Sequence, residues 1–392
     1  MITKHAMRWF GPQDPVSLKE IHQAGATTIV TALHHIPIGE VWSLEEIGKR
    51  QKLILSPLKW EVVESLPVHE DIKKGRPERS KWIENYKNSL RNLTSSGIYT
   101  VCYNFMPVLD WSRTQLQYEL EDGSIALGFD LVEFTAFDLY ILKRENAEYP
   151  EDLASAAEEL YKNSSPETLK RIENSILLGL PGSNDAFELK SLKEMIQEYR
   201  EIPAQQLKEN LYYFIREVGP VADECGIRLC IHPDDPPFPL LGLPRVVSTE
   251  EDLAVLMEAY PSVANGITFC TGSLGVREDN DLVKIFQRWA DRVHFLHLRS
   301  TLRSYTPHLS FYEARHLEGD VNMYQILKAV YEEQKRRAAE GRMDIQIPMR
   351  PDHGHALLND AERPTYPGYT AIGRLKALAE LRGIEYTLTQ VS

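Results

Sequence analysis

Residues 227–235 are IRLCIHPDD, a short apolar run that ends abruptly in a histidine, a proline and two aspartates. Three later stretches have the same plan: GITFCTGS at 266–273, VHFLHLRS at 293–300 and IPMRPDHGH at 347–355. Runs that are mostly apolar, rather than alternating with polar residues, are typical of parallel strands covered on both faces. These stretches therefore predict four consecutive parallel strands, each with polar residues at its carboxyl end.

The pattern extends over most of the chain, because eight such runs occur and longer stretches with helical spacing separate them. The expected strands are Met7–Phe10, Thr27–Leu33, Trp60–Val68, Ile98–Met106, Ile227–His232, Gly266–Cys270, Val293–Leu298 and Asp344–Arg350. The expected helices are Val16–Ala24, Ser43–Gln51, Arg79–Leu93, Gln206–Glu224, Thr249–Ala259, Asp281–Ala290, Val321–Arg337 and Tyr369–Leu381. Eight strand-then-helix units predict an α/β protein with a (β/α)8 barrel.

Local signals mark several helix ends. Ser43 and Glu46 have the spacing of a capping box, which closes the amino end of a helix. Glycines follow four of the helical stretches, where left-handed C-terminal caps are common. They are Gly25, Gly97, Gly226 and Gly383.

One segment, residues 108–204, departs from the alternation. It is rich in charges and helix formers and has no convincing strand, and ASAAEELYKNSSPETLKRIENSILLGL at 154–180 predicts two helices with a turn at Ser164–Pro166. We expect residues 1–392 to form one barrel domain with a helical insertion at 108–204, after the fourth strand, rather than two independent domains. The insertion could be decoration or a cap over the barrel mouth, and the residues favour neither.

Composition excludes several classes of protein. The 392 residues are 43% hydrophobic and 26% charged, which is ordinary for a globular chain, and 44 basic against 57 acidic residues give a net charge of −13. Such a surface repels phosphate backbones, so nucleic acid is not an expected partner. No run approaches the ~20 apolar residues of a membrane span, and the first residues lack the apolar core of a signal peptide. The four cysteines have no CxxC spacing, which predicts reduced thiols in a cytoplasmic protein.

A barrel of this kind carries its active site at the carboxyl ends of its strands. Strands five to eight end near His232, Cys270, His297 and Asp352. Two imidazoles, a thiolate and a carboxylate suit a transition metal such as Mn²⁺ or Fe²⁺, and Zn²⁺ also accepts these ligand types. Each residue alone would usually be a packing residue, so the hypothesis depends on their joint placement. His294 should face away from the site and be structural.

Acid–base and substrate groups are expected beside these ligands. His353 follows Asp352 and can exchange protons near neutral pH, and Tyr366 and Tyr369 lie in the loop before the last expected helix. Arg299 and Arg350 flank the ligand candidates, and arginine binds carboxylates through two hydrogen bonds, which indicates an acidic small substrate. Asp234 and Asp235 precede two prolines and are interpreted mainly as turn formers.

Several longer motifs in the chain carry a family resemblance. They are MRWFGPQDPV at 7–16, TALHHIPIGEVW at 31–42, YNFMPVLDW at 103–111, IHPDDPPFPLLGLPR at 231–245, TFCTGSLG at 268–275, HFLHLR at 294–299, MRPDHGH at 349–355, YPGY at 366–369 and GRLKALAELRG at 373–383. Together they make nearly the whole chain resemble the mannonate dehydratase family.

The resemblance implies a xylose-isomerase-like barrel and an Mn²⁺- or Fe²⁺-dependent lyase that converts D-mannonate to 2-dehydro-3-deoxy-D-gluconate in hexuronate catabolism. It places metal ligands on His232, Cys270, His297 and Asp352, and proton transfer on His353 and Tyr369, with Tyr366 as the alternative tyrosine. A homodimer is expected. The alternatives are a sugar isomerase or epimerase, a metal-dependent phosphodiesterase, which the net charge disfavours, and a sugar-acid sensor without catalysis.

Overall fold

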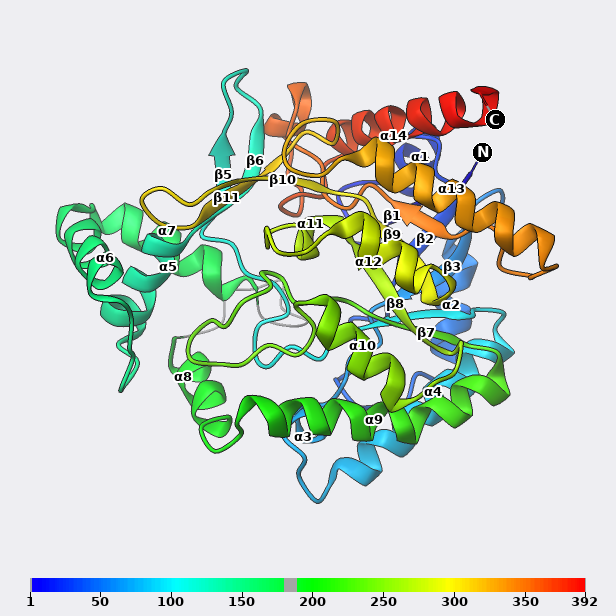
Figure 1. Ribbon diagram of the computed structural model, residues 1–392, viewed down its shortest axis with the longest axis horizontal. Helices are drawn as coiled ribbons and strands as arrows, with labels where there is room; N and C mark the ends of the chain where they lie inside the picture. Colours follow the sequence, from blue (N-terminus) through cyan, green and yellow to red (C-terminus); the bar gives the residue numbers. More distant parts are fainter. Residues whose placement is uncertain (1, 180–188, 392) are drawn as a thin grey trace.

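The computed structural model describes residues 2–179 and 189–391, and its centre is a closed barrel of eight parallel strands (Figure 1). The barrel strands are β1 (Lys4–Arg8), β2 (Thr28–Thr31), β3 (Lys59–Glu64), β4 (Thr100–Tyr103), β7 (Arg228–Ile231), β8 (Asn265–Cys270), β9 (Val293–His297) and β12 (Pro348–Arg350). Their order around the barrel is β1-β12-β9-β8-β7-β4-β3-β2. Each strand overlaps one expected from the sequence, so the prediction of a (β/α)8 barrel is confirmed.

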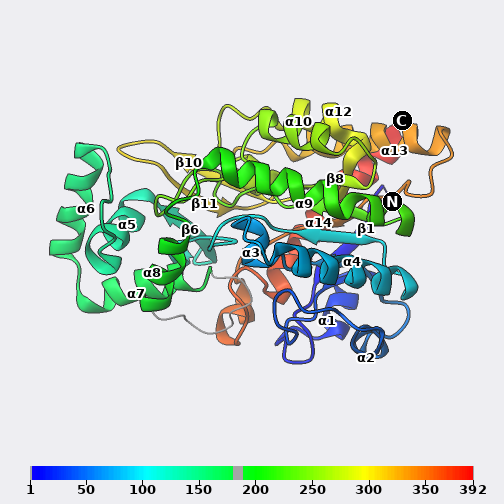
Figure 2. The same cartoon turned by 90° about the horizontal axis from the view of Figure 1, so that it is seen from below.

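Helices surround the barrel and cover the outer face of its strands. The longer ones are α1 (Leu18–Gln23), α2 (Leu44–Leu53), α4 (Arg79–Ser95), α9 (Ala204–Cys225), α10 (Glu250–Ala259), α12 (Leu282–Trp289), α13 (Met323–Ala339) and α14 (Ala371–Val391). The short ones are α3 (Glu70–Lys73), α11 (Thr271–Leu274), η2 (Ala290–Arg292) and η3 (Leu358–Glu362). Figure 2 shows the ring from another side, with α4 and α9 next to each other.

The barrel interior is packed with apolar side chains. A small buried cluster fills it, made of Ala6, Val30, Val62, Cys102, Cys230 and Phe295. A much larger apolar core joins the strands to the surrounding helices. Because the interior is closed by packing, polar side chains at the carboxyl ends of the strands are left to form a site at the barrel mouth.

The helix-end signals are only partly confirmed. The Ser43 hydroxyl accepts a hydrogen bond from the backbone N–H of Glu46, but the Glu46 carboxylate pairs with His35 and Lys49 instead of completing a capping box. Gly25, Gly97 and Gly226 have positive φ angles, as caps require. Gly383 does not end a helix, because α14 continues past it to Val391.

The expectation of a wholly helical insertion at 108–204 is wrong for its first part. That part contains the hairpin β5 (Gln115–Glu119) and β6 (Ile125–Asp130), which joins β10 (Ser300–Ser304) and β11 (Ser310–Ala314) in an antiparallel sheet of order β10-β11-β6-β5. We call these four strands the accessory sheet. The hairpin forms because β6 pairs with β11, nearly two hundred residues later, a partner that local pattern cannot reveal.

The remainder of the insertion is helical, and its helices lie beyond one side of the barrel in Figures 1 and 2. They are α5 (Leu131–Ala136), η1 (Phe137–Leu142), α6 (Glu151–Asn163), α7 (Pro166–Leu177) and α8 (Leu189–Glu198). The expected turn at Ser164–Pro166 separates α6 from α7, whereas residues 180–188 of the predicted insertion lie outside the described residues. Among the helices that the structure describes, none is long and apolar enough to cross a membrane.

Candidate active site

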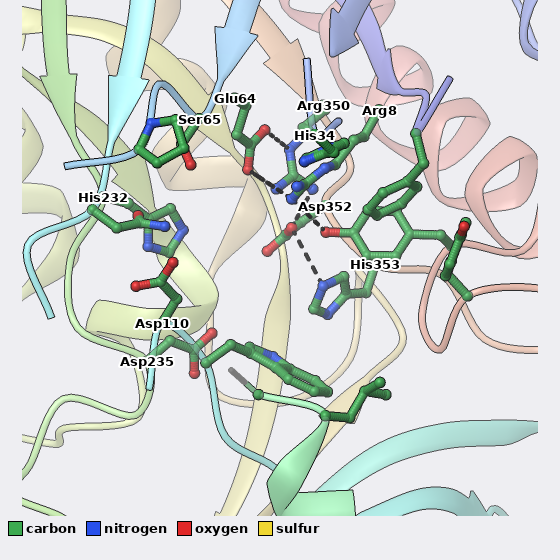
Figure 3. A pocket seen from close by; sticks show the side chains of 18 of the residues that line it. Arg8, His34, Glu64, Ser65, Asp110, His232, Asp235, Arg350, Asp352 and His353 are labelled. Atoms are coloured by element: carbon green, nitrogen blue, oxygen red, sulfur yellow. Dashed lines mark hydrogen bonds and ion pairs between the residues drawn. The ribbon is translucent and has the colours of Figure 1, made fainter. Parts of the chain in front are cut away.

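A cavity of about 260 Å³ lies at the carboxyl ends of the barrel strands. Its walls come from the end of β1 and the loop after it, and from the loops after β2, β3, β4, β7, β9 and β12. The loop before α14 and the start and middle of the insertion complete them (Figure 3). Asp110, Trp111, Leu178 and Gly179 are the insertion residues that line it. This contact favours the hypothesis of a cap over that of decoration.

Three predicted metal ligands meet at the carboxyl ends of β7, β8 and β9, where His232 lines the cavity and Cys270 and His297 are fully buried. The ligating atoms of His232, Cys270 and His297 lie within 4.8 Å of one another, and together they could hold a metal ion. Nε2 of His232 is 3.1 Å from Nδ1 of His297. Nδ1 of His232 lies 2.7 Å from the carbonyl oxygen of Pro233, so this nitrogen carries the proton and the Nε2 lone pair is directed at the group.

Asp352, the fourth predicted ligand, lies beside this group but not within it. Its Oδ2 is 3.7 Å from Sγ of Cys270, and its Oδ1 forms an ion pair with Arg350. Burial raises the pKa of the Asp352 carboxyl, but the charges of Arg350 and Arg299 outweigh burial and hold this pKa well below its usual value. The carboxylate is therefore ionised, as a metal ligand must be. Its φ of 64° is rare for a residue other than glycine and turns the chain sharply at the strand end.

The two predicted proton-transfer residues lie next to each other in the cavity wall. The ring centroids of His353 and Tyr369 are 5.0 Å apart, and both residues line the cavity. Nδ1 of His353 lies 2.8 Å from Oε2 of Glu313, while the Tyr369 hydroxyl lies 3.4 Å from a guanidinium nitrogen of Arg8. Tyr366 also lines the cavity and packs against the ring of Phe10, with centroids 4.3 Å apart.

Arg299 and Arg350 line the cavity, but protein carboxylates occupy their terminal nitrogens. Arg299 donates to Asp235 at 2.7 Å and to Glu313 at 2.9 Å. Arg350 donates to Glu64 at 2.7 Å and also pairs with Asp352. Both side chains are buried, so each arginine serves first to hold the carboxylates of the cavity wall in place.

A buried ionic network that the sequence pattern did not predict lies behind the cavity. Asp235, which we interpreted as a turn former, accepts hydrogen bonds from both Arg113 and Arg299. Glu313 likewise accepts from Arg113 and Arg299 and reaches His353. Arg113 and Glu313 come from the insertion and the accessory sheet, so no signal near the predicted strand ends could have found them. For Asp235 a signal did exist, because this residue comes shortly after an expected strand, where residues of the site were expected.

Two other residues, Asp234 and His294, have the structural roles that the sequence predicts. Oδ2 of Asp234 accepts hydrogen bonds from the backbone N–H groups of Val246 and Val247 and from the Ser248 hydroxyl, as a turn former would. His294 is buried away from the cavity, with Nε2 2.7 Å from the carbonyl oxygen of Val263. Burial lowers the pKa of His294 to about 3, so this histidine is neutral and structural.

The remaining cavity walls add groups that the sequence did not single out. They include Arg8, His34, Glu64, Asn104, Asp110 and Trp111. The cavity thus contains His232 of the metal-binding group, a histidine and a tyrosine suited to proton transfer, and side chains of both charge signs. Such a set can bind a small polar anion and move protons on it.

Comparisons with known proteins agree with this chemistry. The family model for D-mannonate dehydratase (UxuA) matches residues 3–392. The chain is 52% identical over 392 residues to a mannonate dehydratase of Chromohalobacter salexigens, covering 99% of this chain and 100% of that protein. It is 51% identical over 388 residues to one of Marinomonas sp., covering 98% and 99%.

A solved structure shows the same relationship at the level of the fold. The crystal structure of mannonate dehydratase from Streptococcus suis serotype 2 is similar with a TM-score of 0.77 and 32% identity, covering 99% of this chain and 94% of that one. With a barrel, a ligand group and a full-length match in agreement, the chain belongs to the D-mannonate dehydratase family.

Proposed function

We propose that this cavity dehydrates D-mannonate to 2-dehydro-3-deoxy-D-gluconate in hexuronate catabolism, with His232, Cys270, His297 and Asp352 holding a divalent metal. The activity is that of a hydro-lyase, as in the full-length relatives. The observation that carries the proposal is the convergence of three ligating atoms, one of them on His232, which lines the same cavity as His353 and Tyr369.

The donor set suits Mn²⁺ or Fe²⁺. Two imidazole nitrogens and a thiolate favour a transition metal over Mg²⁺ or Ca²⁺, and the ionised Asp352 carboxylate 3.7 Å from the Cys270 sulfur adds a harder oxygen donor. When bound, the ion supplies Lewis-acid chemistry, which stabilises negative charge on substrate oxygens.

Two proton transfers remain for the protein. Removing the C2 proton of mannonate leaves electrons that form the C2–C3 double bond as the C3 hydroxyl, once protonated, leaves as water. The resulting enol then becomes the 2-keto acid. We assign these two transfers to His353 and Tyr369, one acting as base at C2 and the other as acid at the C3 oxygen.

The surrounding side chains prepare His353 for this role. Its Nδ1 is held by Glu313, which fixes Nδ1–H as the donor and leaves Nε2 to exchange protons. Burial of Glu313 behind the cavity also keeps water from competing for this hydrogen bond.

The direct test is incubation with D-mannonate and Mn²⁺ under reducing conditions, because a thiolate ligand is easily oxidised. We expect a 2-keto product that is lighter than mannonate by one water in mass spectrometry. A product of unchanged mass would instead indicate an isomerase or epimerase, and tight binding without turnover would indicate a sensor.

We also propose that the enzyme is a cytoplasmic homodimer. The free cysteines support a reducing location, since none of the four forms a disulfide. Light scattering of the purified protein tests the dimer, and fractionation of cells that express it tests the location.

A further inference from the structure

Within the described part of the chain, three arginines line the cavity, and two of them bind protein carboxylates through their terminal nitrogens. Arg350 donates to Glu64 through both Nε and Nη2, and its Nη1 pairs with Asp352. Arg299 donates to Glu313 through Nη1 and to Asp235 through Nη2, while its Nε lies 3.3 Å from Asp352 without forming a hydrogen bond in the described part of the chain. Another carboxylate could bind the terminal nitrogens of either arginine only by displacing a protein carboxylate.

Arg8, the last residue of β1, is different. Its polar contacts are long: Nη1 lies 3.4 Å from Oε1 of Glu64 and 3.4 Å from the Tyr369 hydroxyl. Nε is buried and has no hydrogen-bond partner within the described part of the chain. Glu64 meanwhile makes its short contact, 2.7 Å, with Arg350. Arg8 is thus a cation at the cavity surface whose hydrogen-bonding capacity is largely unused.

Aromatic rings hold the Arg8 guanidinium in place. Its central carbon lies 4.6 Å from the centroid of the Phe10 ring and 5.6 Å from that of Tyr369. Such contacts orient a guanidinium without consuming its N–H donors. The side chain is 19% exposed, so it can be reached from the cavity.

The opposite wall has the opposite character. Asp110 lies across the cavity from Arg8 in Figure 3, and its Oδ1 is buried with no hydrogen-bond partner among the described residues. A carboxylate repels the acid end of a sugar acid, but it accepts hydrogen bonds from hydroxyl groups. The cavity is therefore polarised, with an available cation on one side and an available acceptor on the other.

We infer that Arg8 binds the substrate carboxylate, so that the C1–C2 end of the sugar acid lies beside the Tyr369 hydroxyl and the polyol end extends toward Asp110. This inference rests on the proposed function, because it takes the substrate to be an aldonate. In this inference Arg8, which the sequence had not singled out, takes the place of Arg299 and Arg350 as the residue that binds the substrate carboxylate.

The test compares an anionic with a neutral ligand. Arg8→Met should raise the KM for D-mannonate about 10- to 100-fold, the loss expected for a charge-assisted hydrogen bond. Inhibition by the uncharged D-mannonamide should stay within about 2-fold, and bound manganese should be unchanged. Arg8→Lys, which keeps the charge but not the paired donors, should show a smaller rise in KM.

Arg288→Met is the matched control, since Arg288 lies on α12 and is largely exposed. It removes the same charge and should leave both ligands unaffected. If Arg8→Met does not fold, Arg8→Gln replaces it in the same comparison.

Two results would overturn the inference: an unchanged KM for mannonate, or equal weakening of mannonate and mannonamide, which would make Arg8 a merely structural residue. Failure of the proposed function is recognised separately, as a wild-type protein that does not convert mannonate. In that event the dissociation constant of mannonate tests the role of Arg8. Equal dissociation constants for wild type and Arg8→Met would overturn the inference that Arg8 binds the substrate carboxylate.

Discussion

Nδ1 of His353 lies 2.8 Å from Oε2 of Glu313, so a strand of the accessory sheet holds the imidazole at the barrel mouth. Glu313 is itself held by Arg113 and Arg299. The orientation of a group we assign to proton transfer therefore depends on a sheet that the insertion completes.

Replacing Glu313 by glutamine should lower kcat about 10- to 100-fold, the usual cost of losing a carboxylate that orients a functional histidine. Metal content should stay the same, because Glu313 is not among the converging ligands. Glu318→Gln, on the exposed turn after β11, is the control and should retain full activity. Steady-state kinetics on both variants check this, and an unchanged kcat in Glu313→Gln would show that the contact is dispensable.

The same carboxylate should make stability depend on pH. Burial raises the pKa of Glu313, but Arg299, His353 and Arg113 outweigh it and lower this pKa to about 2, from an ordinary 4.5. The ionised form is thus favoured by folding, and its contribution to the free energy of unfolding is present above about pH 4.5 and lost as the pH falls toward 2. Glu313→Gln should be less stable than wild type at pH 7, by about 1–3 kcal/mol, and this difference should shrink below pH 4.5. Thermal unfolding of both proteins at pH 7, 5, 4 and 3 measures this difference in stability. A difference that stays constant over this range would contradict a stabilising role for the ionised Glu313 carboxylate.

His353→Asn should reduce turnover of D-mannonate about 10²- to 10⁴-fold, the range typical of a general acid or base. Bound metal should be retained, since the substitution leaves His232, Cys270 and His297 in place. His22→Asn, on the exposed face of α1, provides a control with the same chemical change. Near-wild-type turnover in His353→Asn with metal bound would refute the acid–base role.

Tyr369→Phe and Tyr366→Phe separate the two candidate tyrosines. The Tyr369 hydroxyl is within 3.4 Å of Arg8 and its ring lies against His353, whereas Tyr366 packs on Phe10. We expect Tyr369→Phe to lose about 10²- to 10⁴-fold in kcat and Tyr366→Phe to lose less than about 5-fold. Parallel kinetics with saturating metal decide the matter, and the reverse order of losses would transfer the role to Tyr366.

Cys270→Ser should weaken metal binding, because a hydroxyl is a far poorer ligand for a transition metal than a thiolate. After dialysis, elemental analysis should find substantially less manganese or iron than in the wild type. Cys225→Ser, at the end of α9, is the control and should keep its metal. Equal metal content in both variants would remove Cys270 from the ligand set.

The sequence by itself determined the barrel and the placement of its strand-end residues. Apolar runs such as 227–231 and 293–296 are local patterns, and a parallel barrel brings the carboxyl ends of its strands to one mouth whatever the loops do. His232, Cys270 and His297 could therefore be placed together from spacing alone, and the structure brings their ligating atoms within 4.8 Å.

Only the tertiary structure decided which acidic and basic side chains form ion pairs. Arg299 and Arg350 looked like free cations in the sequence, but chain closure sets Asp235, Glu313 and Glu64 against them and leaves Arg8 with spare donors. The β5–β6 hairpin likewise depends on β11, a distant partner. Periodicity is a property of neighbouring residues, whereas ion pairing and strand pairing depend on distances between residues far apart in the chain, and these exist only after folding.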